Sequence, residues 1–294
     1  MSRKFIGRDG FTWFIGVVED RDDPVQLGRV RVRCFGWHSE NIDQIPTDSL
    51  PWAQVMNGIQ SASVNGLGFS PTGIVEGTWV VGFFVDGERA QEPIVMGTLP
   101  GIPSELPNTD IGFNDPNGVY PKFVGESDVN KLARGVQSKP HTPDSTIGEP
   151  DDPYAAEYPK NHVMETESGH TKEYDDTPNH ERIREMHKSG TFYEVHPDGS
   201  IVTHVVKDGY RVVANNDSVH IKGNVTIYIE KNATMNIGGD WDVNVDGHIN
   251  MDATTINLNS GTKGAARIGD NVADVDPIGD GTINEGSETV FIGD

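Results

Sequence analysis

Cysteine is almost missing from this sequence: Cys34 is the single one among 294 residues. One cysteine excludes an intrachain disulfide framework, and the apolar alternation around Cys34 predicts a small core residue. Long apolar runs are missing as well. No stretch approaches about 18 apolar residues, so we expect no membrane-spanning helix. The N-terminal residues 1–10 lack the apolar segment of a secretory signal, so we expect no such signal.

Positive charge is also scarce. The chain has 23 Lys and Arg residues against 45 Asp and Glu residues, which gives a net charge of −22 at pH 7. This charge repels nucleic-acid phosphates and anionic membranes, so we expect no stable nucleic-acid binding. Glycine is frequent, with 34 residues, and aromatic residues make up 8%. These values are typical of a β-rich globular protein with many turns, and the length fits about two domains.

Residues 1–100 predict an OB-type barrel. Five short segments rich in β-branched and aromatic residues are separated by turn-forming residues, with no strong helical pattern. The predicted strands are residues 11–18, 27–35, 51–56, 78–86 and 93–99. Residues 101–160 differ in composition from the barrel segments, because Pro, Asn and Gly recur along them. Five prolines lie from Pro140 to Pro159, so an extended arm followed by a Pro-rich linker is predicted here.

An eight-residue repeat begins at Gly223. Four octads start at residues 223, 231, 239 and 247, and each has apolar residues at its third, fifth and seventh positions. Repeats of this kind indicate a solenoid. Eight residues reach only about 26 Å, too short for one chain to close a three-sided rung. Three chains, each supplying one side, can close it, so the repeat predicts a trimeric triple-stranded β-helix.

The apolar octad positions form the predicted trimer core. Its members are Val225, Ile227, Ile229, Met235, Ile237, Trp241, Val243, Val245, Ile249 and Met251. A calcium β-roll has nine-residue repeats with glycine and aspartate at fixed positions, whereas the aspartates here occupy no fixed position. A β-solenoid that binds calcium or glycan nevertheless stays open as an alternative.

Several long, collinear segments resemble a known family. Residues 13–38, 45–52, 70–84 and 112–121 resemble the N-terminal OB domain of the central tail-spike proteins of T-even-type contractile phages. Residues 162–200 resemble the start of the C-terminal triple-stranded β-helix of these proteins, and of the related type VI secretion spikes. The resemblance implies an all-β chain with an OB barrel, an extended linker and a trimeric β-helical needle.

The same resemblance implies a place and partners. The chain would form a homotrimer at the centre of a virion's tail baseplate, against a trimeric hub protein and the end of the tail tube. It would pierce the host outer membrane and peptidoglycan on tail contraction, with a separate tip protein as a further partner. Arg29, Arg31 and Arg33 alternate on one strand. Residues 1–100 contain 8 basic and 12 acidic residues, so we expect these arginines to face an acidic hub protein rather than nucleic acid.

The best-known member of that family carries a lysozyme domain between barrel and needle. Here only a short Pro-rich segment separates Arg134 from His162, too little for a helical muramidase. Nucleophile-elbow, metalloprotease and P-loop motifs are missing too. We therefore expect no enzyme activity, no catalytic residues and no cofactor. A peptidoglycan hydrolase with an unrecognised site stays open, because the many carboxylates could supply a catalytic pair.

Six histidines fall within 43 residues, but without the spacing of zinc motifs. They are His162, His170, His180, His187, His196 and His204. An axial metal ion on the threefold axis of the needle stays open. Residues 263–294 resemble portions of spike-tip proteins but lack their Cys and His ligands, so we do not expect a zinc-pinned cone. We still expect a short folded tip, because residues 289–294 are strand-like and a blunt trimer would expose its last apolar layer to water. The predicted domains are therefore 1–100, 101–160, 161–262 and 263–294.

Overall fold

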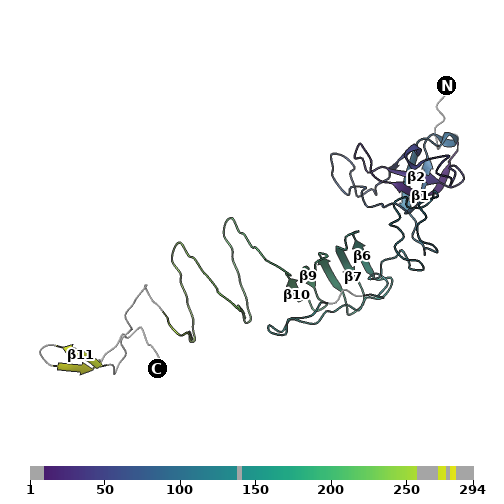
Figure 1. Cartoon of the computed structure of the whole chain (residues 1–294). Coiled ribbons are helices and arrows are strands. Elements are labelled where there is room, and N and C mark those ends of the chain that lie inside the picture. The colour runs from purple at the N-terminus through teal and green to yellow at the C-terminus, as the bar shows by residue number, and fades with distance from the viewer. Residues whose placement is uncertain (1–9, 138–140, 257–270, 276–278, 283–294) are drawn as a thin grey trace. The chain divides into compact units, whose positions relative to one another are not determined.

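The structure is a computed structural model that describes residues 10–137, 141–256, 271–275 and 279–282. The described residues form twelve β-strands and two short 3-10 helices, η1 (Thr47–Ser49) and η2 (Gly87–Arg89), which confirms the all-β prediction (Figure 1). None of the described helices is long and apolar enough to cross a membrane. The chain divides into two units, Met1–Tyr228 and Ile229–Asp294.

The first five strands close into a barrel. They are β1 (Trp13–Asp20), β2 (Val30–Cys34), β3 (Trp52–Val55), β4 (Trp79–Phe84) and β5 (Pro93–Thr98). Their order around the barrel is β1-β2-β3-β5-β4. β3 and β5 run parallel, and the other neighbouring pairs are antiparallel. This topology confirms the predicted OB-type barrel, and each strand overlaps one of the predicted segments.

The barrel has a core made by its own chain. Successive side chains of a strand point to opposite faces, so every second residue reaches the interior. Val18, Val80 and Phe84 have no exposed surface, and Val32 is 1% exposed. Cys34 is also fully buried, as predicted, and burial raises the pKa of its thiol. These apolar residues form one contiguous cluster across the barrel strands.

The arm that follows the barrel packs against it. The Phe113 amide donates to Glu19 Oε1 at 2.7 Å, and the Gly112 amide donates to the Glu40 carbonyl at 2.7 Å. A Cβ atom on Gly112 would overlap the Arg33 side chain, so the arm can approach only with glycine here. The predicted arm is therefore a folded part of the barrel domain.

Residues 161–204 form a second sheet. Its strands are β6 (Asn161–Glu165), β7 (Thr171–Asp175), β8 (Arg182–Met186), β9 (Phe192–Val195) and β10 (Ile201–His204). Each strand pairs antiparallel with the next one in sequence. This differs from the predicted intertwined β-helix over 161–262, because short connections favour pairing within one chain.

Residues 205–256 contain no strand, and every one of them is exposed. Bends recur at eight-residue intervals: at 206–207, 214–215 and 222–223 in the first unit, then at 230–231, 238–239, 246–247 and 254 in the second. Of the predicted tip, the structure describes only β11 (Asn271–Val275) and β12 (Gly279–Thr282), an antiparallel pair. The other residues of 263–294 lie outside the described residues.

Candidate assembly surfaces

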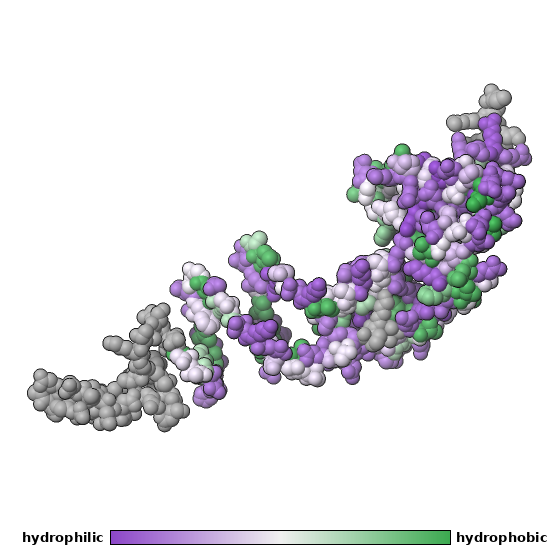
Figure 2. All heavy atoms as spheres, viewed as in Figure 1, coloured by the Kyte–Doolittle hydropathy of each residue, from purple (hydrophilic) through white to green (hydrophobic). Residues whose placement is uncertain are grey.

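The octad stretch exposes the whole predicted trimer core. Exposed fractions range from 45% for Ile237 to 78% for Ile227, and Trp241 is 67% exposed. Figure 2 shows hydrophobic residues, in green, at the surface of this stretch. Single exposed apolar residues are ordinary, but a repeating row of them marks an interaction surface.

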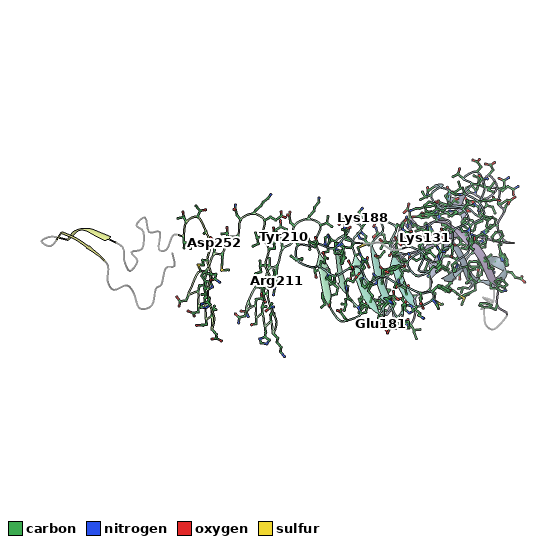
Figure 3. The ribbon with its side chains drawn as sticks, turned by 90° about the horizontal axis from the view of Figure 1, so that it is seen from below. Lys131, Glu181, Lys188, Tyr210, Arg211 and Asp252 are labelled. Atoms are coloured by element: carbon green, nitrogen blue, oxygen red, sulfur yellow. The ribbon has the colours of Figure 1, made fainter. Side chains whose placement is uncertain are left out.

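The bends set the boundaries of the octads. They fall at the last and first positions of the octads that start at residues 223, 231, 239 and 247. The same spacing continues backward to residue 207, which adds two octads that the apolar pattern had not revealed. In these octads Val213, Val219 and Ile221 are exposed, but Arg211 and Asp217 interrupt the alternation and form an ion pair at 2.5 Å. Figure 3 shows Tyr210 and Arg211 on this stretch, and Tyr210 is 87% exposed.

The β6–β10 sheet presents a second exposed apolar surface. Strand pairing aligns Tyr174 with Ile183, Ile183 with Val195, and Val195 with Ile201 in one row across the sheet. Tyr193 lies in the adjacent row on the same face. Tyr174, Ile183, Tyr193 and Ile201 are each at least 42% exposed. We call Tyr174, Ile183, Tyr193, Val195 and Ile201 the open face of the sheet.

The opposite face of this sheet is buried and charged. Arg182 pairs with Glu173 at 2.6 Å and with Glu194 at 3.2 Å, and Arg184 pairs with Glu194 at 3.1 Å. These four side chains are at most 3% exposed. Burial raises the pKa of Glu194, against the opposing effect of both arginines. The sheet is thus charged inside and carries an exposed apolar row outside, whereas an ordinary half-buried sheet packs its apolar face on its own core.

The Pro-rich segment covers this charged face. Tyr154 donates its hydroxyl to the Leu132 carbonyl at 3.0 Å, and its ring lies 5.0 Å from the Arg182 guanidinium. Asp152 pairs with Arg184 at 3.3 Å. The segment predicted as a linker is therefore a packed cover for the sheet, and this corrects the prediction. Prolines fit this role because they hold the chain extended without needing a ladder hydrogen bond.

The predicted hub-facing arginines are bound within their own chain. Arg29 pairs with Asp23 at 2.7 Å, and Arg31 pairs with Asp20 at 3.2 Å. Both keep part of their side chains exposed, so contact with a partner stays a prediction for them. The prediction that Arg33 faces the hub is wrong, because its side chain is fully buried and pairs with Glu19 at 2.6 Å.

The sequence did not reveal that Glu19 is the buried partner of Arg33. It accepts from the Arg33 guanidinium, from the Thr47 hydroxyl at 2.9 Å and from the Phe113 amide at 2.7 Å. The carboxylate therefore joins the barrel to the arm, and the available signal was a charged residue directly after the predicted strand 11–18. A buried carboxylate survives only when it is paired in this way.

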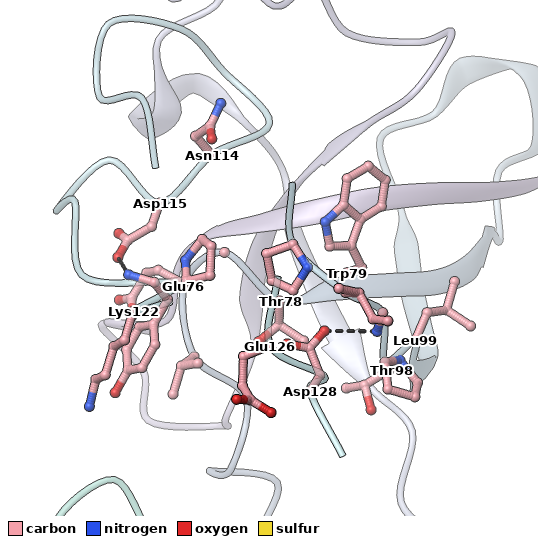
Figure 4. Close-up of a pocket in the computed structure, with 18 of the residues that line it drawn as sticks. Glu76, Thr78, Trp79, Thr98, Leu99, Asn114, Asp115, Lys122, Glu126 and Asp128 are labelled. Carbon is pink, nitrogen blue, oxygen red and sulfur yellow. Dashed lines mark hydrogen bonds between the residues drawn. The ribbon is translucent and has the colours of Figure 1, made fainter. Parts of the chain in front are cut away.

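An open pocket lies where the arm meets the ends of β4 and β5, with a volume of about 1010 Å³ (Figure 4). Three of its carboxylates hold the chain in place. Asp128 accepts from the Gly101 amide at 2.8 Å, and Glu76 pairs with Arg21 at 3.2 Å. Asp115 accepts from three backbone amides of its own loop. Groups already committed to such bonds are poorly placed for proton transfer to a substrate.

The clustered histidines do not converge on one site. The tilted rings of His170 and His187 have centroids 4.5 Å apart, His196 lies 3.1 Å from Glu194, and exposed His162 lies 3.4 Å from Asp176. His204 instead lies near two residues of the Pro-rich segment. Within the described part of the chain, this is the single group of three side chains with spacing suited to a metal.

Comparison with known proteins finds one matching family model and related phage proteins. Residues 37–186 match the family model described as the Gp5 N-terminal OB domain. Protein Gp5 of Vibrio phage KVP40 is 41% identical over 278 residues, covering 78% of this chain and 66% of that protein. The pre-baseplate central spike protein Gp5 of Enterobacteria phage T4 is 48% identical over 132 residues, covering 43% of this chain and 23% of that protein. The chain thus spans less than two thirds of the length of each of these relatives.

Proposed function

The chain belongs to the Gp5 family, whose N-terminal OB domain it carries, and we propose that it forms the central spike of a contractile-tail baseplate. The T4 relative is named as a pre-baseplate central spike protein. The observation that carries the proposal is the octad stretch, with bends every eight residues and apolar side chains left exposed. A rigid needle needs such a repeat, because stacked rungs bury one continuous core.

The proposed spike is a homotrimer. One octad reaches about 26 Å, so three chains are needed to enclose a rung. Fully burying one Val, Ile or Met side chain is worth about 1.5–3 kcal/mol relative to leaving it exposed. The predicted core residues would contribute this free energy of burial at every rung. Backbone groups of residues 205–256, which form no ladder in the single chain, would then pair between chains.

The open face of the β6–β10 sheet supports the same assembly. Its apolar row leads directly into the octad stretch, since Ile201 lies on the last strand before the first bend. The face opposite is already covered by the chain itself, through Tyr154 and Asp152. A second copy of the chain is therefore the proposed occupant of the open face.

The proposed location is the centre of the virion baseplate. The barrel would contact a trimeric hub protein and the end of the tail tube, and residues beyond the octads would carry a tip or a separate tip protein. On contraction the needle would pierce the outer membrane and meet the peptidoglycan mechanically. We propose that the chain hydrolyses no peptidoglycan, because three of the pocket carboxylates, those of Asp128, Glu76 and Asp115, serve backbone and arginine partners.

Size measurement tests the assembly. Light scattering of the purified full chain should give three times the chain mass of 32.1 kDa. Ile183→Glu introduces a charge on the open face and should shift the population toward monomer. Lys188→Glu introduces the same side chain in an exposed turn and should leave the trimer intact. A monomeric wild type, or equal behaviour of the two variants, would contradict the proposed interface.

Labelled micrographs and a turbidity assay test the role. Antibody to this chain should mark the tail axis at the baseplate, and label elsewhere on the particle would refute the spike assignment.

Purified protein added to chloroform-treated Gram-negative cells should leave turbidity unchanged. Clearing that persists through repurification would contradict the proposed lack of hydrolase activity.

A further inference from the structure

Three side chains with the chemistry of zinc ligands converge at the edge of the β6–β10 sheet. His204 comes from β10, and His141 and Glu149 come from the Pro-rich segment. One ligand atom of each lies within 4.8 Å of one such atom of the other two. The His141 and Glu149 side chains are only 12% and 8% exposed. His204 is far in sequence from the other two, so the fold brings it to them.

The spacing suits a tetrahedral ion. Zinc binds imidazole nitrogen and carboxylate oxygen at about 2.0–2.2 Å, which places neighbouring ligand atoms about 3.3 Å apart. His141 Nε2 and Glu149 Oε1 lie 2.8 Å apart, at hydrogen-bond distance. An ion could replace the shared proton if these two atoms separated by about half an ångström. Two imidazoles and one carboxylate would leave a fourth position for water.

The surroundings orient the ligands. The second oxygen of Glu149 accepts from the Asp144 amide at 2.7 Å, which fixes the carboxylate. Phe192 makes an edge contact with the His141 ring at 4.9 Å and stacks on the His204 ring at 5.4 Å. Partners of this kind hold metal ligands in position before the ion binds.

The local charge also admits a cation. Arg184 is the nearby positive group, with its guanidinium 4.6 Å from the centre of the Phe192 ring. It is already neutralised by Asp152 at 3.3 Å and Glu194 at 3.1 Å. Glu149 offsets one charge of a divalent ion, and the chain as a whole is strongly acidic. Buried ions of one sign require such compensation.

We propose that His141, Glu149 and His204 bind one Zn²⁺ per chain and fasten the Pro-rich segment to β10. Imidazole nitrogen favours zinc over calcium or magnesium, which prefer oxygen ligands. In this proposal the ion holds the cover of the charged sheet face closed, beside the strand that enters the octads. It differs from an axial ion shared by three chains, and it holds whether or not the chain forms a spike.

Metal titration of the full chain tests the site. Protein stripped with a chelator and then titrated with Zn²⁺ should bind one ion per chain, and its melting temperature should rise. Co²⁺ should give the visible absorption of a tetrahedral site. Glu149→Gln keeps the side-chain shape but removes the charge, and should weaken Zn²⁺ binding by more than about tenfold. His204→Ala should weaken it at least as much.

His187→Ala is the matched control. It removes one ring from the neighbouring pair His170 and His187, which belongs to no metal-spaced group among the described residues. This variant should bind Zn²⁺ like the wild type. Melting curves in chelator show whether each variant folds. The proposal is overturned if folded Glu149→Gln and His204→Ala bind Zn²⁺ as tightly as His187→Ala, or if the wild type binds none.

Discussion

The barrel and the octad stretch use the same alternation of apolar and polar residues, with opposite results. In the barrel, Val18 and Val80 are fully buried by strands of their own chain. In the octads, Val243 and Val245 are 51% and 49% exposed. A closed barrel supplies both sides of its core, whereas eight-residue rungs supply one side only. Alternation thus predicts that a face will be buried, but it does not say which chain will bury it.

The burial of the β6–β10 sheet is intermediate between that of the barrel and that of the octad stretch. Its charged face is complete within one chain, because Arg182 and Glu173 pair under Tyr154. Its open face, with Ile183 and Tyr193, is left uncovered by the residues that the structure describes. The molecule therefore passes along its sequence from a self-sufficient core, through a sheet covered on one face, to a stretch whose apolar side chains are all exposed.

Val243→Asp should have the largest effect on this contrast. In the proposed trimer it would place three carboxylates together in a dry core, and each unpaired buried charge costs several kcal/mol. We expect the trimer to be lost while the barrel keeps its fold. Native mass spectrometry at micromolar concentration, with near-UV circular dichroism for the barrel, measures both. A variant that keeps the trimer mass would show that octads do not form an intertwined core.

Arg33→Ala should act on the barrel alone. It leaves Glu19 buried without its guanidinium partner, since both side chains are at most 1% exposed. Breaking such a pair costs about 3–5 kcal/mol. Urea unfolding followed by tryptophan fluorescence measures the loss, which should not depend on protein concentration.

The Glu19→Gln/Arg33→Met double variant is the control for the buried pair. It removes both charges, so it should recover a large part of the stability lost in Arg33→Ala. A double variant no more stable than the single variant would mean that the lost contacts to the Ser39 and Ile45 carbonyls dominate instead.

Glu167→Gln should have a smaller, pH-dependent effect. Hydrogen bonds from Arg21 and then Tyr120 lower the pKa of Glu167, and burial with this contact raises the pKa of Tyr120 to about 12. A lowered carboxyl pKa stabilises the fold above the unfolded value and loses that contribution as pH falls through the folded value. The side chain is 49% exposed, so we expect at most about 1 kcal/mol.

Denaturant unfolding at several pH values checks the Glu167 contact. The difference between wild type and Glu167→Gln should be present at pH 7 and should shrink as pH falls below about 4.3. High salt should also reduce it, because exposed pairs are screened. A difference that grows on acidification would contradict the assigned role of the ion pair.

Asp242→Asn should have the smallest effect. Asp242 alternates with Val243 and should face water in the proposed needle, where substitutions change stability by about 0.5 kcal/mol or less. Thermal melting and native mass spectrometry, run beside Val243→Asp, measure the difference between the two faces. Loss of the trimer on this substitution would place the aspartate row inside, contrary to the proposal.

Alternation located all five barrel strands, because it is a local property that survives in every strand with one buried face. It also located the octads, whose bends confirm the eight-residue spacing. It could not identify the charged face of the second sheet. Glu173 and Arg182 look like solvent-facing residues in sequence, and they are buried only because the Pro-rich segment crosses them.

The sequence by itself determined where the strands and octads lie, since hydrophobic period and turn residues act over a few neighbours. Only the tertiary structure decided which polar groups are inside. It buried Arg33 against Glu19 under the arm, and it brought His141 and Glu149 to His204. The physical reason is that a buried charge or a ligand set depends on partners distant in sequence. No local pattern records a distance between side chains that meet only after the chain has folded.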